Sequence, residues 1–142
     1  MGTLQGKVAV VTGAGQGVGQ GIALALASEG ASVAVVGRTL SKLEDTCTQL
    51  RERGVRAGAY QLDLLDTDAI GPLVDTIAAD LGRLDVVVNN AYDGVMMPLL
   101  DMTLKNFTKG FVSGPFAAFA LMKAAHPHLV AAGGGSIVNL VT

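Results

Sequence analysis

The chain has 142 residues, of which 50% are hydrophobic and 15% are charged, and its formal net charge is -2 at pH 7. This composition excludes a disordered chain, and the small negative charge gives no general attraction to nucleic acid or to anionic membranes. The length fits one domain over residues 1–142, and no apolar run approaches the roughly 20 residues that span a bilayer. The N-terminus has no signal-peptide pattern and Cys47 is the only cysteine, so we expect a cytoplasmic protein.

Apolar runs and helical patterns alternate along the chain. Five short runs predict buried strands, at residues 8–11, 33–36, 59–62, 85–88 and 136–141. Four helical patterns fill the intervals between these runs. Strict alternation with buried strands predicts an α/β fold, a doubly wound parallel sheet of the Rossmann type with helices on both faces. On this reading the sheet is incomplete after the fifth strand.

The helical patterns predict which residues are buried, which residues cap the helices and where one helix breaks. The first helix is expected to bury a face made of Val18, Ile22, Ala25 and Leu26. Ser41 is expected to cap the second helix, and Asp66 or Thr67 to open the third. The long fourth helical region should break or kink near residues 114–115, where a glycine precedes a proline.

The turn after the first strand is rich in glycine and reads Thr12-Gly13-Ala14-Gly15-Gln16-Gly17-Val18-Gly19. Such a turn can be only a tight connection, but it can also present backbone N–H groups to a phosphate at a helix N-terminus. The Gly-Lys-Ser/Thr of a triphosphatase loop is missing, because Gln20 follows Gly19. No register gives G-x-G-x-x-G either. The pattern that fits is T-G-x-x-x-G-x-G, with glycines 13, 17 and 19.

This pattern resembles the short-chain dehydrogenase/reductase family, and further motifs of that family occur in order along the whole chain. Asp63-Leu64 resembles an acidic motif after the third strand, and the resemblance implies that Asp63 accepts a hydrogen bond from the adenine amino group. Asn89-Asn90-Ala91-Tyr92 resembles the Asn-Asn-Ala-Gly segment that stabilises the sheet and contacts the cofactor ribose. Here Tyr92 replaces the glycine and adds a ring near the nicotinamide side of the cleft.

Taken alone, Asp63 reads as a helix cap or a turn residue, and the paired asparagines as a left-handed turn. The resemblance implies a cofactor site made of Gly13, Gly15, Gln16, Gly17, Val18, Gly19, Arg38, Thr39, Asp63, Leu64, Asn89, Ala91 and Tyr92.

The end of the second strand, Gly37-Arg38-Thr39, bears on which nicotinamide cofactor binds. It has no carboxylate to accept from the 2′-hydroxyl of NAD(H), whereas the guanidinium of Arg38 is a planar fork of donors that suits a 2′-phosphate. These residues favour NADP(H). NAD(H) remains the alternative, in which Arg38 stacks on the adenine or is solvated. Gln16 weakens the preference, because NADP-preferring members of the family often carry a basic residue in the glycine loop.

The resemblance implies hydride transfer between the cofactor and a small ketone or secondary alcohol. The family uses a Tyr and a Lys four residues later, an orienting Ser and a relay Asn. Neither Tyr60 nor Tyr92 has a Lys four residues on, and residues 111–116 replace the Asn-containing segment. Thr142 falls where the orienting Ser sits, although a Ser just after it is an equal candidate. We therefore expect the biological chain to continue with the catalytic Tyr-x-x-x-Lys, and these 142 residues alone to be inactive.

Two other function classes stay open, a nucleotide-binding module without catalysis and an inactive truncated fragment. The resemblance also implies a homo-oligomer, which Phe116, Phe119 and Leu121 of the long helix permit. His126 and His128 have no nearby Cys or carboxylate in the sequence, so they indicate a solvated helix end and no metal site. The last predicted strand is an unprotected apolar edge, and we expect more chain or a partner to cover it.

Overall fold

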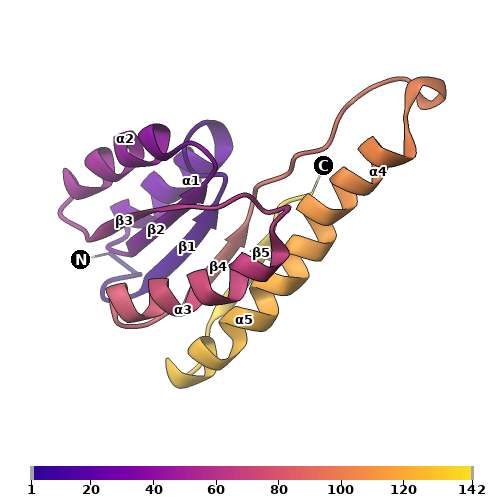
Figure 1. The fold of residues 1–142 in the computed structure, drawn as a ribbon. Coiled ribbons are helices and arrows are strands. Elements are labelled where there is room, and N and C mark those ends of the chain that lie inside the picture. Colours follow the sequence, from indigo (N-terminus) through magenta and orange to yellow (C-terminus); the bar gives the residue numbers. More distant parts are fainter. Residues whose placement is uncertain (1, 142) are drawn as a thin grey trace.

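The computed structural model describes residues 2–141, which form one parallel sheet with helices on both faces (Figure 1). The strands are β1 (Val8–Thr12), β2 (Ser32–Gly37), β3 (Ala57–Gln61), β4 (Val86–Asn89) and β5 (Ser136–Asn139). The helices are α1 (Gly17–Ser28), α2 (Leu40–Arg51), α3 (Ile70–Leu81), α4 (Leu104–Phe111) and α5 (Ala117–Ala131). Two 3-10 turns, at Thr67–Ala69 and Leu99–Asp101, and a π-helical turn at Val112–Phe116 complete the set. The predicted doubly wound fold is confirmed.

The strand order is β3-β2-β1-β4-β5, and every pair is parallel. The chain therefore moves outward from β1 through β2 to β3, and then crosses back over β1 to start β4 on its other side. At such a reversal the connections leaving two neighbouring strands diverge, so a crevice opens beyond their carboxyl ends. The topology alone thus places a binding site beyond the ends of β1 and β4.

Helices α1 and α2 cover one face of the sheet, and α3 and α5 cover the other. Successive strand residues point to opposite faces, so Val33 and Val35 of β2 pack against the first layer while Ala34 and Val36 pack against the second. Both faces are buried along β1 and at the centres of β2 and β4, so these strands have no polar alternation and their sequences read as continuous apolar runs. Strand β5, which was also predicted to be buried, is exposed along its length.

The inner face of α1 differs from the prediction. Gly19, Ala23 and Ala27 are buried, whereas Val18 is 66% exposed. The reason is the close approach of the helix to the glycine turn: an added Cβ at Gly19 would collide with the carbonyl oxygen of Gly13. Small residues therefore form the contact face, and the larger ones lie beside it or face away.

The other helix predictions have mixed outcomes. The N-cap of α2 is Thr39 and not Ser41. Asp66 is the N-cap of the 3-10 turn Thr67–Ala69. Helix α3 follows this turn directly and begins at Ile70. The predicted break near Gly114 is confirmed as the π-helical turn, which accommodates Pro115 between α4 and α5.

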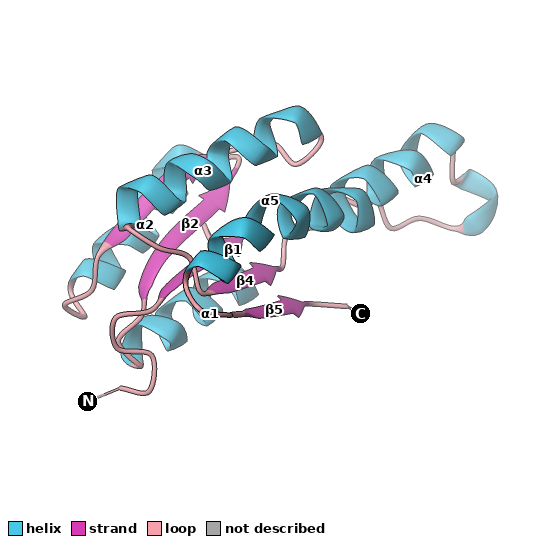
Figure 2. Cartoon of the chain, turned by 90° about the horizontal axis from the view of Figure 1, so that it is seen from below, coloured by secondary structure: helices cyan, strands magenta, loops and turns pink. Residues whose placement is uncertain are grey.

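The sheet ends at β5, as Figure 2 shows. Among residues 2–141, Ile137 is 41% exposed and Val138 is 48% exposed, and the covering of this strand by more chain or by a partner stays a prediction. No helix between residues 2 and 141 is both long enough and apolar enough to cross a membrane.

A buried carboxylate, Asp85, joins the amino ends of β1 and β4, at the opposite end of the sheet from the crevice. It accepts hydrogen bonds from the Val8 amide at 2.9 Å, from Arg83 at 2.7 and 2.8 Å, and from Lys7 at 3.3 Å. Burial raises the pKa of Asp85, but the hydrogen bonds from Arg83, Val8 and Lys7 outweigh this effect and hold the pKa below its ordinary value.

A depressed pKa in the folded state makes this carboxylate a source of acid sensitivity. Its stabilising contribution is complete above the unfolded pKa of about 4 and is lost as the pH falls through the lower folded value. We expect Asp85→Asn to lower the free energy of unfolding at pH 7 by about 2 kcal/mol and to flatten its dependence on pH below about 4. Urea unfolding at pH 7 and in the acid range measures both effects. Equal losses of stability at all pH values would contradict this role.

Candidate functional site

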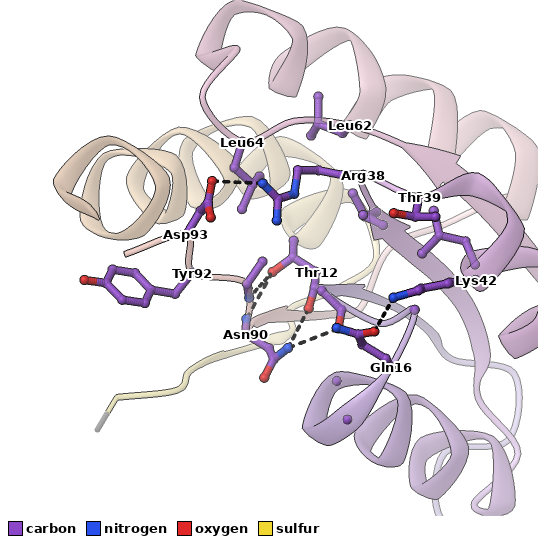
Figure 3. Close-up of a pocket in the computed structure, with 18 of the residues that line it drawn as sticks. Thr12, Gln16, Arg38, Thr39, Lys42, Leu62, Leu64, Asn90, Tyr92 and Asp93 are labelled. Atoms are coloured by element: carbon purple, nitrogen blue, oxygen red, sulfur yellow. Dashed lines mark hydrogen bonds and ion pairs between the residues drawn. The ribbon is translucent and has the colours of Figure 1, made fainter. Parts of the chain in front are cut away.

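A cleft of about 410 Å³ opens at the carboxyl edge of the sheet, beyond the ends of β1, β2 and β4 (Figure 3). Every residue of the predicted cofactor site except Asn89 lines this cleft. The structure thus brings together the glycine turn, the end of β2, Asp63-Leu64 and Ala91-Tyr92, which are far apart in the sequence. The site lies where the strand order reverses, as the topology requires.

The glycine turn forms an open cradle at the start of α1. Gly13 and Gly17 have φ values of 65° and 58°, a conformation that residues with a Cβ rarely adopt. Gln16 occupies the N-cap position without capping the helix through its side chain. The first-turn amides of a helix have no intrahelical partner, and here the N-cap side chain does not accept from them either, so they suit an anion such as the pyrophosphate of a dinucleotide.

Two side chains hold the glycine turn against the segment after β4. The hydroxyl oxygen of Thr12 accepts hydrogen bonds from the amides of Asn90 and Ala91, both at 3.0 Å. The side-chain amide of Asn90 donates in return to the carbonyl oxygens of Thr12 at 3.0 Å and Gly13 at 3.4 Å. These reciprocal bonds, drawn in Figure 3, fix the width of the cleft at its floor.

The two asparagines of the motif have different places. Asn90 lines the cleft, whereas the motif predicts Asn89 for the site. Asn89 is the last residue of β4, and its side-chain amide donates to Asn139 of β5 at 2.8 Å. The strand register thus directs Asn89 toward sheet pairing, and its contact with a cofactor stays a prediction.

Two cationic side chains line the cleft where β2 ends and α2 begins. Arg38 pairs with Asp93 at 2.9 Å, and Lys42 donates to the Gln16 side chain at 2.5 Å. Lys42 was not predicted, although its place in the first turn of α2 put it within reach. It supplies from α2 the positive charge that the glycine loop lacks.

Asp93 was not predicted either. It pairs with Lys109 of α4 at 2.8 Å as well as with Arg38, and its backbone N–H donates to the buried hydroxyl of Ser113 at 3.0 Å. The hydrogen bond from Lys109, with the charges of Arg38 and Lys109 beside it, holds the pKa of Asp93 below its ordinary value. No local sequence signal marks this residue, because its partners come from distant parts of the chain.

Asp63 and Tyr92 lie at the borders of the cleft. Asp63 accepts a hydrogen bond from the Leu65 amide at 3.0 Å, so it also serves as a turn residue. The side chain of Tyr92 is 67% exposed, and Figure 3 shows its ring pointing away from Arg38 and the glycine turn. The phenol lies over Gly110 and Gly114: an added Cβ would come within 2.9 Å of its hydroxyl oxygen at Gly110 and within 3.3 Å of its ring at Gly114.

The other predicted side chains take structural places or fall outside the structure. Thr142 lies outside the described residues, so its catalytic assignment stays a prediction. His128 pairs with Asp75 of α3 at 2.6 Å. Within residues 2–141, no three His, Cys, Asp or Glu side chains gather into a possible metal site. Cys47 is buried in the core, and this burial raises its pKa to about 11, which makes the thiol unreactive.

Comparison with known proteins assigns this fold and cleft to a family. The sequence model of the short chain dehydrogenase family matches residues 7–142. The chain therefore belongs to the short-chain dehydrogenases, a family of oxidoreductases that bind NAD or NADP.

Individual relatives agree with this assignment. An uncharacterized oxidoreductase of Mycobacterium tuberculosis is 38% identical over 138 residues, which are 96% of this chain and 52% of the relative. A metagenomic short-chain oxidoreductase solved with NADP superposes with a TM-score of 0.88 at 36% identity, covering 96% of this chain and 62% of the other. Carveol dehydrogenase of Mycobacterium avium, solved with NAD, gives 0.91 at 29% identity, with 98% and 55% covered. The chain spans about half the length of the curated relatives it matches.

The Thr12 hydroxyl provides a test of how the cleft is built. We expect Thr12→Val, which keeps the shape but leaves the two amides of Asn90 and Ala91 without their acceptor, to destabilise the fold by about 2–4 kcal/mol. Thr12→Ser keeps the hydroxyl and should remain within about 1 kcal/mol of the wild type. Urea unfolding monitored by circular dichroism compares the two variants. Equal losses in both would show that the hydroxyl does not hold the cleft.

Proposed function

We propose that this chain forms the cofactor-binding part of an oxidoreductase that transfers hydride between NADP(H) and a small ketone or secondary alcohol. The observation that carries the proposal is the pairing of an open glycine cradle with two cations at one end of the same cleft. The cradle suits a pyrophosphate, and Arg38 with Lys42 suits the extra phosphate of NADP(H). NAD(H) is the weaker alternative, because the end of β2 carries no carboxylate for a free 2′-hydroxyl.

The residues present fit the cofactor on geometric grounds. Gly13 and Gly17 keep the turn in a conformation that exposes its amides, and the cleft floor is fixed by Thr12 and Asn90. Asp63 lies beside the cleft with an exposed carboxylate that can accept from an adenine amino group. We assign these residues to binding and orientation of the nucleotide.

The chemistry proposed for the whole protein is a two-electron reduction and its reverse. The carbonyl carbon accepts a hydride and the carbonyl oxygen accepts a proton, so a ketone becomes a secondary alcohol as NADPH becomes NADP⁺. The proton needs an acid such as the Tyr-x-x-x-Lys pair of the family, which these 142 residues do not contain. We propose that they bind nucleotide without reducing carbonyl compounds by themselves.

We further propose that the protein is cytoplasmic and self-associates through the α4–α5 region. Phe116 and Phe119 support an apolar contact there, because they are 58% and 63% exposed. Leu121, which we had grouped with them, is buried in the core and takes no part in that surface.

The role of Arg38 can be tested by binding. We expect the chain to bind NADPH more tightly than NADH, and Arg38→Ala to weaken NADPH by about tenfold, while NADH changes by less than about twofold. The cause is the loss of the planar donor fork for the 2′-phosphate. Isothermal titration calorimetry measures the four dissociation constants.

Arg53→Ala is the matched control, because Arg53 is exposed just beyond the end of α2 and does not line the cleft. It removes the same charge and should leave both dissociation constants unchanged. Equal affinities of the wild type for NADPH and NADH, unaltered in Arg38→Ala, would contradict the preference for NADP(H).

A further inference from the structure

The guanidinium assigned to the 2′-phosphate already has an anionic partner. Arg38 follows β2, Asp93 follows β4, and β1 lies between these strands, so their ion pair crosses the carboxyl end of β1. Both residues line the cleft, and Figure 3 shows the pair spanning it on the side opposite Asn90. A nucleotide that enters the cleft here encounters an Arg38 guanidinium that already donates a hydrogen bond to Asp93.

The two partners differ in how firmly they are held. Asp93 is tied by its backbone to the buried Ser113 and by its carboxylate to Lys109, and its side chain is only 27% exposed. The side chain of Arg38 is 60% exposed. Among the described residues, its guanidinium donates a hydrogen bond to Asp93 alone. The carboxylate is therefore the fixed member, and the guanidinium is the member that can turn toward another anion.

We propose that Asp93 is a specificity-determining residue that acts through Arg38, by competing with the 2′-phosphate of NADP(H) for the guanidinium. This inference rests on the proposed function. Binding of NADP(H) requires Arg38 to exchange one anion for another, whereas NAD(H) has only a neutral hydroxyl at this position and leaves the pair intact. Asp93 thus reduces the preference for NADP(H) that Arg38 alone would give.

Lys109 lowers the free-energy cost of this exchange of anions at Arg38. When Arg38 leaves, the carboxylate of Asp93 retains the ammonium of Lys109 at 2.8 Å and is not left without a counter-charge. The penalty is therefore that of one partly exposed ion pair, which corresponds to a change of about two- to fivefold in affinity.

The test compares ligands that differ only in the 2′-phosphate, adenosine 2′,5′-bisphosphate and adenosine 5′-monophosphate, together with NADPH and NADH. Calorimetry on the full chain gives the affinity ratio for each pair. We expect Asp93→Asn and Asp93→Ser to raise the ratio in favour of the 2′-phosphate by about threefold. Asp93→Glu keeps the carboxylate and should stay near the wild type. Circular dichroism confirms folding, and the use of two neutral variants protects the test if one of them misfolds.

Two controls separate this mechanism from general repulsion. Asp101→Asn removes the same charge from an exposed position outside the cleft and should leave the ratios unchanged. In an Arg38→Ala background, Asp93→Asn should also have no effect on the ratios, because the Asp93 carboxylate then has no guanidinium for which to compete with the phosphate.

An unchanged ratio in both neutral variants would overturn the inference while leaving the proposed function intact. An equal rise with and without Arg38 would do the same, since it would show direct repulsion between Asp93 and the phosphate. Failure of the wild type to bind any of the four nucleotides would instead overturn the proposed function, and this inference with it.

Discussion

The cleft depends on the hydrogen bonds that join the end of β1 to the segment after β4. The hydroxyl of Thr12 accepts from two amides of that segment, and Asn90 donates back to the start of the glycine turn. A parallel sheet that reverses its strand order opens a crevice at this point, but the topology does not set the distance between its walls. The side chains of Thr12 and Asn90 set it, and the glycine turn can therefore present its amides in a fixed direction.

The two ends of the sheet are held together by different groups. At the amino ends, the buried Asp85 neutralises the cations of Lys7 and Arg83 and joins β1 to β4. At the carboxyl ends, the glycine turn, the cations of Arg38 and Lys42 and the carboxylates of Asp63 and Asp93 line the cleft. The same two strands are thus joined at both ends, by a buried carboxylate at the amino ends and by neutral hydrogen bonds beside the cleft.

The fold and most of the site were predictable from the sequence because their signals are local. The strands are consecutive apolar residues, and the glycine turn lies within eight consecutive positions, Thr12 to Gly19. The inner face of α1 was predicted only in part. Ile22 and Leu26 pack against the core, but Gly19, Ala23 and Ala27 make the buried contact, because the helix approaches the glycine turn too closely for larger side chains. Asp93 was missed because its partner Arg38 is 55 residues away and is brought near only by the crossing to β4. Whether Asn89 or Asn90 lines the cleft depends on strand register, which the motif does not encode.

The central claim is that the crevice between the glycine turn, Arg38 and Asn90 binds a nicotinamide dinucleotide. Titration of the ¹⁵N-labelled chain with NADPH, followed by amide chemical shifts, tests it most directly. The account predicts saturable shifts gathered at residues 13–19, at Arg38 and Thr39, and at residues 90–93, with little change at Asp85. Shifts gathered instead at the hollow beside Tyr60 and Asp80, or no shifts at saturating nucleotide, would contradict it.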